Sequence, residues 1–306
     1  MTRKGLVKSY LKSGAYKLGC ILISDERFTR WQHKRETGRP LDLANPVSFN
    51  EKIQWIKLNC RGDRYRTCAD RVAVRDFVSD TIGEHVLPEL YGVYTSVDQI
   101  DFSRLHYPCV LKAAHGSGQN AFLKHKRDVD PKQLRRLLKY YLWANHFIVG
   151  REWAYKHVPP RIISEQYLLE EGGLPKDYKV YCFNGEPKAV HVNYDYSRGH
   201  ERNMIERNTY DTEWNLLPWV WGPPGAAECE EASKDDVERP RKLATMLDYS
   251  RQLADGFSFV RVDWYYIEDE IIFGEMTLYP FKGTGVFMPE SYDLVLGSYL
   301  ELPNQL

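Results

Sequence analysis

The chain has no excess of charge of either sign. Its 306 residues include 42 Lys and Arg and 42 Asp and Glu, so the formal net charge at pH 7 is zero. Without a basic excess, the chain has no general attraction to the phosphate backbone of a nucleic acid. The sequence therefore predicts that nucleic acid is not among the partners of this protein.

Long apolar runs and closely spaced cysteines are also absent from the sequence. No segment approaches the roughly 18–20 apolar residues of a membrane span, and LGCILI is too short for the core of a signal peptide. None of the six cysteines forms a CxxC pair or another metal-ligand spacing, and several lie in apolar runs such as PCVLK. This cysteine usage predicts reduced, buried thiols in a cytoplasmic protein.

Basic residues are concentrated near the N-terminus, where residues 1–40 contain ten Lys or Arg and three Asp or Glu. In GLVKSYLKSGAYKLGCILI, apolar side chains recur at helical spacing and the lysines lie largely off that stripe. Such a helix could associate peripherally with the inner face of a membrane through anionic lipids. It could also pack its apolar stripe on the body of the protein, and the sequence leaves both interpretations open.

Capping residues and turn signals indicate an α+β chain. Ser48 and Glu51 form a capping box that opens a helix through about Leu58, and Asp130-Pro131 begins another. Asn184-Gly185 is a strong hairpin signal. The other expected elements are helices over 65–79 and 241–254, strands over 109–113, 162–168, 177–183 and 187–195, and a Trp- and Pro-rich surface segment over 212–240.

A β-hairpin is expected over Arg261–Thr277, RVDWYYIEDEIIFGEMT, because Val, Ile, Tyr, Trp and Phe dominate both arms. A loop of three or five residues around the acidic turn would pair Ile267 with Ile271, Tyr265 with Phe273, Asp263 with Glu275 and Arg261 with Thr277. A two-residue loop at Asp269-Glu270 would instead direct the two carboxylates to opposite faces.

The pairing of Asp263 with Glu275 calls for a compensating charge, because like charges directly opposite each other destabilise a hairpin. The simplest candidate is a hard divalent cation, Mg²⁺ or Mn²⁺, held by carboxylate oxygens and completed by phosphate oxygens. The alternative is a solvated hairpin face that carries two unrelated acids.

A second candidate site begins at Lys112, which ends an apolar strand just before the loop His115-Gly116-Ser117-Gly118. A Lys beside a glycine-rich loop can contact phosphate oxygens as a point charge, while the glycines let backbone N–H groups approach the same oxygens. The order differs from a Walker A motif, in which the Lys follows the loop. A plain turn between two strands is the alternative interpretation.

The order of these parts resembles the ATP-grasp superfamily, in which ATP lies between two α+β subdomains. Within it, the chain resembles the TupA-like branch, which is found with genes for bacterial teichuronopeptide, capsule and O-antigen synthesis. The resemblance runs from about Asn45 to Leu302. It rests on NPVSFNEKIQWIKL, CADRVAVRDFV, CVLKAAHGSGQN, PRIISEQYL, DYKVYCFNG, FSFVRVDWY, FGEMTLYP and LGSYLELP. It implies a helical N-terminal region over 1–100, a lid subdomain with the Gly-rich loop over 101–165, and a C-terminal subdomain with the metal site over 166–306.

The resemblance also implies roles for individual residues. Lys112 would contact the ATP phosphates beneath the loop of His115, Gly116, Ser117 and Gly118, and Lys179 is a second candidate contact. Glu165, Gln166 and Tyr167 would form the adenine-binding hinge. Asp263 and Glu275 would hold Mg²⁺, and Arg261 and Lys112 would act in catalysis by stabilising the transferred phosphoryl group.

Two positions depart from the family pattern. Arg71 stands where the family has the Lys of an ADK motif, so a planar fork replaces a point charge at a nucleotide contact. Thr277 stands where ATP-grasp enzymes commonly have an Asn metal ligand, and its hydroxyl would be a weaker ligand.

The function that the resemblance implies is an ATP-dependent carboxylate–amine ligase that works through an acyl-phosphate. Its carboxylate would be a sugar uronate of a bacterial surface polysaccharide or its precursor, and its nucleophile an amine or amino acid. The alternatives are a glycosyltransferase that uses a nucleotide sugar, an ATP-dependent phosphotransferase acting on a glycan hydroxyl, and a glycan-binding scaffold. In the scaffold, Trp214, Trp219 and Trp221 would form a sugar platform, although they could instead anchor a long loop.

Overall fold

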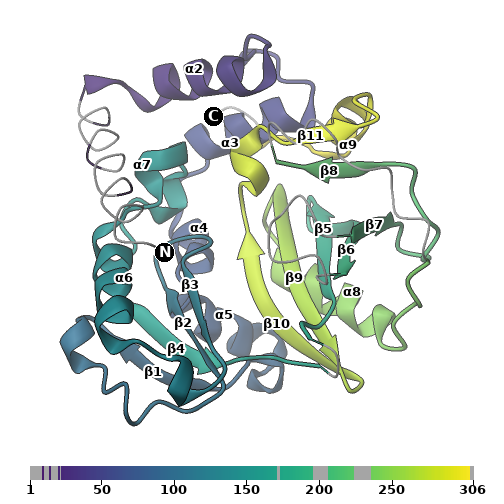
Figure 1. The fold of residues 1–306 in the computed structure, drawn as a ribbon. Coiled ribbons are helices and arrows are strands. Elements are labelled where there is room, and N and C mark those ends of the chain that lie inside the picture. The colour runs from purple at the N-terminus through teal and green to yellow at the C-terminus, as the bar shows by residue number, and fades with distance from the viewer. Residues whose placement is uncertain are drawn as a thin grey trace. The chain divides into compact units, whose positions relative to one another are not determined.

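The structure is a computed structural model that describes residues 22–170, 173–195, 206–223 and 236–303, together with residues 9, 14 and 20. The chain forms two compact units that are interleaved in the sequence (Figure 1). The first unit comprises Met1–Thr29, Arg61–Phe77 and Pro88–Leu168, and the second comprises Arg30–Cys60, Val78–Leu87 and Leu169–Leu306. Residues 1–100, expected from the sequence as one N-terminal region, contribute to both units.

The first unit is built on an antiparallel sheet with the strand order β1-β4-β2-β3. Its strands are β1 (Leu90–Tyr94), β2 (Cys109–Ala113), β3 (Asn120–Leu123) and β4 (Ile162–Gln166). Its helices and 3₁₀ turns are α4 (Asp63–Ala69), η2 (Val97–Gln99), η3 (Lys126–Asp128), α6 (Pro131–Trp143), α7 (Phe147–Gly150) and η4 (Trp153–Tyr155). Helices α2 (Asp25–Thr37) and α5 (Ala73–Ile82) contribute residues to both units.

Helix α6 covers one face of this sheet and begins where the sequence predicts. The Asp130 carboxylate accepts the backbone N–H groups of Lys132 and Gln133, and a proline occupies the first turn. Leu134 and Leu138 of α6 are buried in one cluster with Leu111 of β2. Because side chains alternate along a strand, the neighbouring Lys112 lies on the opposite face.

The single helix expected over residues 65–79 is wrong, because the structure divides it into α4 and α5. The break is at Asp70, which has extended backbone angles (φ −90°, ψ 112°). Its carboxylate accepts the backbone N–H of Val72 at 3.0 Å and forms an ion pair with Arg161. A short acidic side chain that bonds its own backbone competes with the helical hydrogen bonds, and this contact explains the break.

The second unit is built on an antiparallel sheet with the strand order β10-β9-β5-β6-β7, beside a ribbon of β11 and β8. Its strands are β5 (Asp177–Phe183), β6 (Glu186–Asp195), β7 (Glu206–Tyr210), β8 (Val220–Gly222), β9 (Phe259–Ile267), β10 (Glu270–Thr277) and β11 (Val286–Met288). Its helices and 3₁₀ turns are α3 (Phe49–Asn59), η1 (Glu84–Val86), α8 (Leu243–Ala254), η5 (Pro280–Gly283) and α9 (Tyr292–Tyr299). Both units combine helices with antiparallel sheets, which confirms the predicted α+β class.

The two faces of the five-stranded sheet have different coverings. On one face, Ser250 of α8 accepts a hydrogen bond from the indole of Trp264 at 2.8 Å. On the other face, Phe49 of α3 is fully buried among aromatic rings, with Phe259 4.9 Å and Trp221 5.2 Å away between centroids. Burying a side chain of this size contributes about 1.5–3 kcal/mol. The predicted capping box holds the start of α3, since Ser48 and Glu51 accept each other's backbone N–H groups.

The Trp-rich segment over 212–240 is not only a surface excursion. Trp219 and Trp221 are 3% and 1% exposed, and residues 220–222 pair with β11. Trp214 stacks on Tyr210 with parallel rings 4.2 Å apart, and its indole donates to the carbonyl of Val237 at 2.9 Å. The three tryptophans therefore anchor this segment to the second unit.

The structure bears on two expectations about the cellular compartment, the absence of a membrane span and the reduced state of the cysteines, for the residues that it describes. In the part of the chain that is described, no helix is long and apolar enough to cross a membrane. The segment expected to form a basic N-terminal helix falls almost entirely outside the described residues. The five cysteines within the described ranges are all free thiols, and Cys68, Cys109 and Cys182 are buried.

Candidate functional site

The acid pair predicted from the sequence is present in the second unit. Asp263 of β9 lies directly opposite Glu275 of β10, and Arg261 lies opposite Thr277. The turn, however, has two residues rather than three or five: Ile267 pairs with Glu270. The expected pairings of Ile267 with Ile271 and of Tyr265 with Phe273 are wrong, because Tyr266 and Trp264 take those partners.

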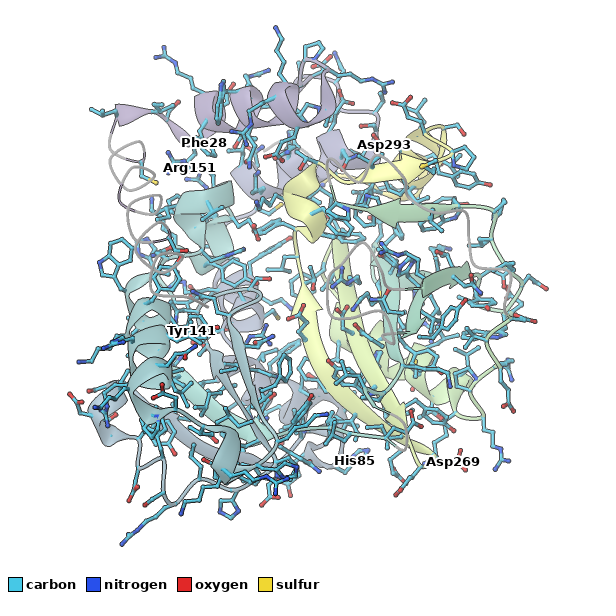
Figure 2. The ribbon with its side chains drawn as sticks, viewed as in Figure 1. Phe28, His85, Tyr141, Arg151, Asp269 and Asp293 are labelled. Carbon is cyan, nitrogen blue, oxygen red and sulfur yellow. The ribbon has the colours of Figure 1, made fainter. Side chains whose placement is uncertain are left out.

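The two-residue turn and the acid pair are both possible because β10 contains a bulge. Glu268 and Asp269 have positive φ angles of 50° and 63°, as a tight hairpin turn requires, and Asp269 lies at its tip (Figure 2). The register shifts between Phe273 and Glu275, and Gly274 is the extra residue. A Cβ at Gly274 would lie 2.9 Å from the carbonyl oxygen of Asp263, so only glycine fits the bulge.

Arg261 binds both oxygens of the Asp263 carboxylate. Its Nε and Nη2 donate to Oδ1 and Oδ2, each at 2.6 Å, and Nη2 also donates to the Thr277 hydroxyl at 3.0 Å. The Thr277 hydroxyl in turn donates to Glu275 at 3.2 Å. Arg261 and Asp263 are only 9% and 4% exposed. The guanidinium therefore fixes the carboxylate in one orientation, as a planar fork does best.

Lys179 of β5 approaches the same carboxylate from the other side. Its ammonium donates to Oδ2 of Asp263 at 3.0 Å and forms an ion pair with Asp177. Burial alone would lower the pKa of Lys179, but the carboxylates of Asp177 and Asp263 outweigh it and raise that pKa. Burial raises the pKa of Asp177 even against the attraction of Lys179. Two cations and three carboxylates thus form one cluster, largely buried except at Glu275, in which the acids outnumber the cations by one.

This cluster fits a hard divalent cation that arrives with a phosphate ligand. Within the described residues there is no group of three or more His, Cys, Asp and Glu that could enclose a metal by itself. Asp263, Glu275 and Thr277 offer oxygen donors only, and the side chain of Glu275 is 35% exposed. Mg²⁺ is typically bound through one or two carboxylates, with the remaining positions filled by water and substrate phosphates.

The first unit brings together the other predicted residues. Lys112 of β2 forms an ion pair with Glu165 of β4, on the sheet face opposite α6. The two residues are diagonal neighbours, because Glu165 pairs directly with Val110. Their side chains are 17% and 8% exposed. An ammonium and a carboxylate are therefore held beside each other next to the Gly-rich loop.

The imidazole of His115 fixes the start of that loop. Its Nε2 lies 3.0 Å from the carbonyl oxygens of Tyr141 and Ala144 at the end of α6, and its Nδ1 accepts the backbone N–H of Arg161 at 3.4 Å. These partners identify Nε2 as the donor of a neutral ring, and burial lowers the pKa of His115. The structure therefore places His115 as an anchor of the loop.

The rest of the loop is more accessible than its first residue. Ser117 and Gly118 are exposed, and Gly118 has a positive φ of 71°. Gly116 is buried, and a Cβ there would require the side-chain amide of Gln119 to move. Arg71 lies beside the start of the loop, since its backbone N–H donates to the carbonyl of Ala114 at 3.1 Å.

The predicted hinge residues follow Glu165 at the end of β4. The backbone N–H of Gln166 donates to the carbonyl of Glu89, the residue before β1, at 2.9 Å, so that donor is already used. The ring of Tyr167 is 7% exposed and lies 5.1 Å from that of Phe122. The side chain of Tyr167 is thus buried beside Phe122 of β3 rather than facing solvent.

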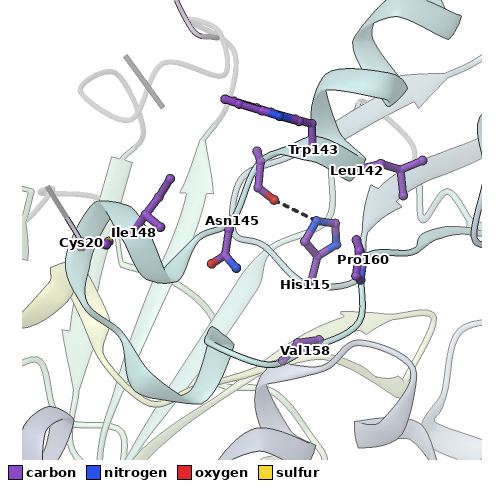
Figure 3. Close-up of a pocket in the computed structure, with 9 residues that line it drawn as sticks. Cys20, His115, Leu142, Trp143, Asn145, Ile148, Val158 and Pro160 are labelled. Atoms are coloured by element: carbon purple, nitrogen blue, oxygen red, sulfur yellow. Dashed lines mark hydrogen bonds between the residues drawn. The ribbon is translucent and has the colours of Figure 1, made fainter. Parts of the chain in front are cut away.

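A cavity of about 330 Å³ in the first unit borders the first residue of the loop. His115 forms part of its wall, with residues of α6 and α7 around it (Figure 3). Its lining residues are Cys20, His115, Leu142, Trp143, Ala144, Asn145, Ile148, Val158 and Pro160. None of the residues predicted to contact nucleotide, apart from His115, lines this cavity.

Sequence reasoning overlooked Asp177, His191 and Thr209. Asp177 was read only as the start of a strand, although it stands two residues before Lys179 and therefore on the same face. His191 lies opposite Lys179, and Thr209 lies opposite His191. For His191 the available signal in the sequence was Pro187, because a proline inside a strand often marks a bulge, and a bulge changes which residues lie opposite each other.

Comparison with known proteins identifies the family. The family profile described as TupA-like ATPgrasp matches residues 51–301, most of the chain. The chain belongs to the TupA-like ATP-grasp family. No curated protein matches the sequence.

Several solved structures are similar to this TupA-like chain at low sequence identity. One is an ADP complex of N5-carboxyaminoimidazole ribonucleotide synthetase, at 15% identity and a TM-score of 0.43, matched over 75% of this chain and 50% of that one. Another is D-alanine–D-alanine ligase from Bacillus anthracis with ATP, at 12% identity and 0.37, over 74% and 55%. A third, the ATP-grasp ligase PsnB with a minimal precursor, has 11% identity and 0.39, over 74% and 60%. The TupA-like chain thus spans about half the length of the first two of these structures.

Proposed function

We propose that this TupA-like protein is an ATP-dependent carboxylate–amine ligase. The observation that carries the proposal is the buried cluster of the second unit, in which Arg261 and Lys179 hold the Asp263 carboxylate beside Glu275. A paired set of acids with two fixed cations suits the binding of a metal-chelated triphosphate. Membership of an ATP-grasp family supports the same nucleotide.

Residues of the first unit have proposed roles in binding the nucleotide. Lys112 would contact the phosphates, and the exposed part of the loop, Ser117 and Gly118, would close over them. Glu165 would present its carboxylate, and the chain after it its backbone, to the adenosine part of ATP. The ion pair of Lys112 with Glu165 supports this placement, because it holds the ammonium in position before a ligand arrives.

Asp263, Glu275 and Thr277 would hold Mg²⁺, which when bound would neutralise charge on the phosphate oxygens of ATP. Arg261 keeps the Asp263 carboxylate in its orientation and would present its remaining N–H donors to the transferred phosphoryl group. Lys179 would contribute an ammonium N–H to a phosphate oxygen. Fixed donors of this kind act without reorganisation, and the loss of one commonly costs about 10²–10³ in rate.

The proposed reaction has two steps. A carboxylate oxygen of the first substrate attacks the γ-phosphorus of ATP while the bond to the β-phosphate oxygen breaks, which gives ADP and an acyl-phosphate. A neutral amine then attacks the carbonyl carbon, inorganic phosphate leaves, and a proton is released to solvent. Arg261 and Lys112 would stabilise the negative charge that develops on the phosphoryl oxygens. We propose a sugar uronate of a surface polysaccharide precursor as the carboxylate and an amino acid or other amine as the nucleophile.

The competing functions differ in what they release. A glycosyltransferase would release a nucleoside diphosphate from a nucleotide sugar, and a glycan kinase would release ADP without free phosphate. A glycan scaffold would release nothing. The three tryptophans of its proposed platform are packed against other parts of the second unit, so the structure offers no support for the scaffold.

The proposal is tested by measuring ADP and inorganic phosphate with a panel of uronates and amines. Wild-type protein should release both in equal amounts only when carboxylate and amine are present together. Asp263→Asn and Glu275→Gln should lower this rate at least about 100-fold. Glu270→Gln is a matched control on the same strand, because Glu270 is an exposed partner of Lys242. Release of ADP and phosphate that does not require the uronate, or that persists in both acid variants, would refute the ligase proposal.

A further inference from the structure

Five side chains form a straight row across the sheet of the second unit. Glu275, Asp263, Lys179, His191 and Thr209 come from β10, β9, β5, β6 and β7, and each lies directly opposite the next. Directly opposite residues have Cβ atoms about 4.5–5.5 Å apart and share one face. The proposed metal and phosphate site accounts for the first three members of this row. It gives no role to His191 or Thr209.

A bulge in β6 is what brings His191 into the row. At the hairpin end, Phe183 pairs with Glu186 and Cys182 pairs with Pro187; beyond the register shift, Lys179 pairs with His191. Without the shift, Val190 would lie opposite Lys179, and His191 would lie on the face that α8 covers. The irregularity therefore exchanges an apolar side chain for an imidazole beside Lys179.

The imidazole is fixed and uncharged. His191 is 4% exposed, and its Nδ1 lies 2.9 Å from the hydroxyl of Thr209. Burial, together with the cations of Arg207, Lys179 and Arg261, lowers the pKa of His191 well below its ordinary value. Asn193 also hydrogen-bonds its side chain, and the ring of Tyr181 lies 6.4 Å away.

The absence of charge on His191 matters because the ammonium of Lys179 has few N–H donors to share among its partners. An ammonium has three N–H donors, and Asp177 and Asp263 accept from Lys179. An acid at position 191 would accept the third donor, and a cation there would compete for Asp177. With Nδ1 accepting from the Thr209 hydroxyl, Nε2 carries the N–H of the neutral ring, so the ring offers no acceptor to Lys179 and one ammonium donor remains for a ligand.

We propose that His191, fixed by Thr209, is a positioning residue that limits the partners of Lys179 to Asp177, Asp263 and one oxygen of a nucleotide phosphate. The inference rests on the proposed ATP site and goes beyond it, since His191 itself need not touch the nucleotide. It makes the β6 bulge part of the binding site, because the bulge alone decides which residue faces Lys179.

The experiment compares His191→Gln with His191→Glu, two side chains of similar size that differ in charge. ATP binding with Mg²⁺ is measured by calorimetry, and unfolding of the same variants is measured without ligand. His191→Glu should weaken ATP binding roughly 10–100-fold, the worth of a hydrogen bond from a charged donor. His191→Gln should bind ATP within about threefold of the wild type. Equal affinity of both variants, in folded protein, would overturn the inference.

A second pair keeps the test decisive if His191→Glu does not fold. Thr209→Val removes the partner that fixes the ring, whereas Thr209→Ser keeps a hydroxyl in place. We expect Thr209→Val to raise the KM for ATP several-fold at little change in kcat and Thr209→Ser to resemble the wild type. Identical KM values for the two variants would refute the positioning role. A wild-type protein that does not bind ATP would instead refute the proposed function, so the two failures are distinguishable.

Discussion

Asp263 and Glu275 lie directly opposite each other, although the turn that joins their strands has only two residues. The bulge at Gly274 shifts the register by one residue between the turn and the acids. Without this shift, the two carboxylates would face opposite sides of the sheet. A single glycine thus decides whether the second unit can present a pair of acids to one ligand.

Substitution of Gly274 should therefore separate the two acids. Gly274→Ala places a Cβ 2.9 Å from the Asp263 carbonyl, so the bulge must move or straighten. We expect a loss of about 1–3 kcal/mol in the free energy of unfolding and at least a tenfold loss in Mg²⁺-dependent ATP affinity. Gly62→Ala is a control, because its Cβ would meet nothing closer than 3.9 Å. Gly274→Ala protein with wild-type ATP affinity would show that the bulge does not set the site.

The ion pair of Lys112 with Glu165 should show strong coupling in a double-mutant cycle. Lys112→Met leaves the 8% exposed carboxylate of Glu165 without its ammonium, which should cost about 3–5 kcal/mol. Lys112→Met combined with Glu165→Leu should cost less than Lys112→Met alone, since the buried carboxylate that lost its ammonium is then also removed. Urea unfolding of the single and double variants measures this coupling. Additive costs would mean that the two side chains do not interact.

The protein should lose stability as the pH falls below about 6.5. Burial lowers the pKa values of His33, His115 and His191. Each native imidazole therefore stays unprotonated in a pH window where the unfolded chain, with its ordinary pKa, binds a proton. Stability contributed by these groups is present above pH 6.5 and is lost as the pH falls, by up to about 1.4 kcal/mol per pH unit for each histidine.

Urea unfolding between pH 7.5 and pH 5 checks this sign. His191→Gln should reduce the slope of stability against pH, by up to the contribution of one proton. The exposed His106 provides the control substitution His106→Gln. A slope that is unchanged by His191→Gln would mean that His191 is not held uncharged in the native state.

The loop after β10 should depend on buried amides of α3. Phe281, Lys282 and Gly283 have positive φ angles, and the carbonyl of Gly283 accepts the amide N–H of Gln54 at 2.9 Å. Gln54→Leu leaves this buried carbonyl without that donor, at a cost of about 1–3 kcal/mol. Gln252→Leu, on the exposed side of α8, should change stability by less than about 0.5 kcal/mol. Thermal unfolding of both variants decides; equal melting temperatures would contradict the role of Gln54.

How far the sequence predicts this fold depends on the register of its strands. The acid pair was predicted with the correct partners but from the wrong turn, because alternation alone does not reveal a bulge. Gly274 was the available signal, since an isolated glycine inside a strand often marks one. For β6, Pro187 was the equivalent signal, and overlooking it hid the position of His191. A bulge is a one-residue change whose effect appears only when both strands are paired.

The remaining differences come from side chains that bond distant backbone. His115 belongs to the loop predicted to cover phosphate, and the sequence did not reveal that its ring bonds the end of α6, more than 25 residues away. Asp70 ends a helix because its carboxylate bonds both the guanidinium of Arg161 and the backbone N–H of Val72. In contrast, the caps at Ser48 and Asp130 use residues within three positions, and both were predicted correctly. Local hydrogen bonds are readable from sequence, whereas long-range ones require the fold.

The most direct test of this account is calorimetric titration of the protein with ATP, with and without Mg²⁺. We expect Mg²⁺-dependent binding by the wild type and by Glu270→Gln, and at least a tenfold weaker affinity for Asp263→Asn and Glu275→Gln. ATP binding that is as tight in both acid variants as in the wild type, or that ignores Mg²⁺, would contradict the claim that these two carboxylates form the metal site.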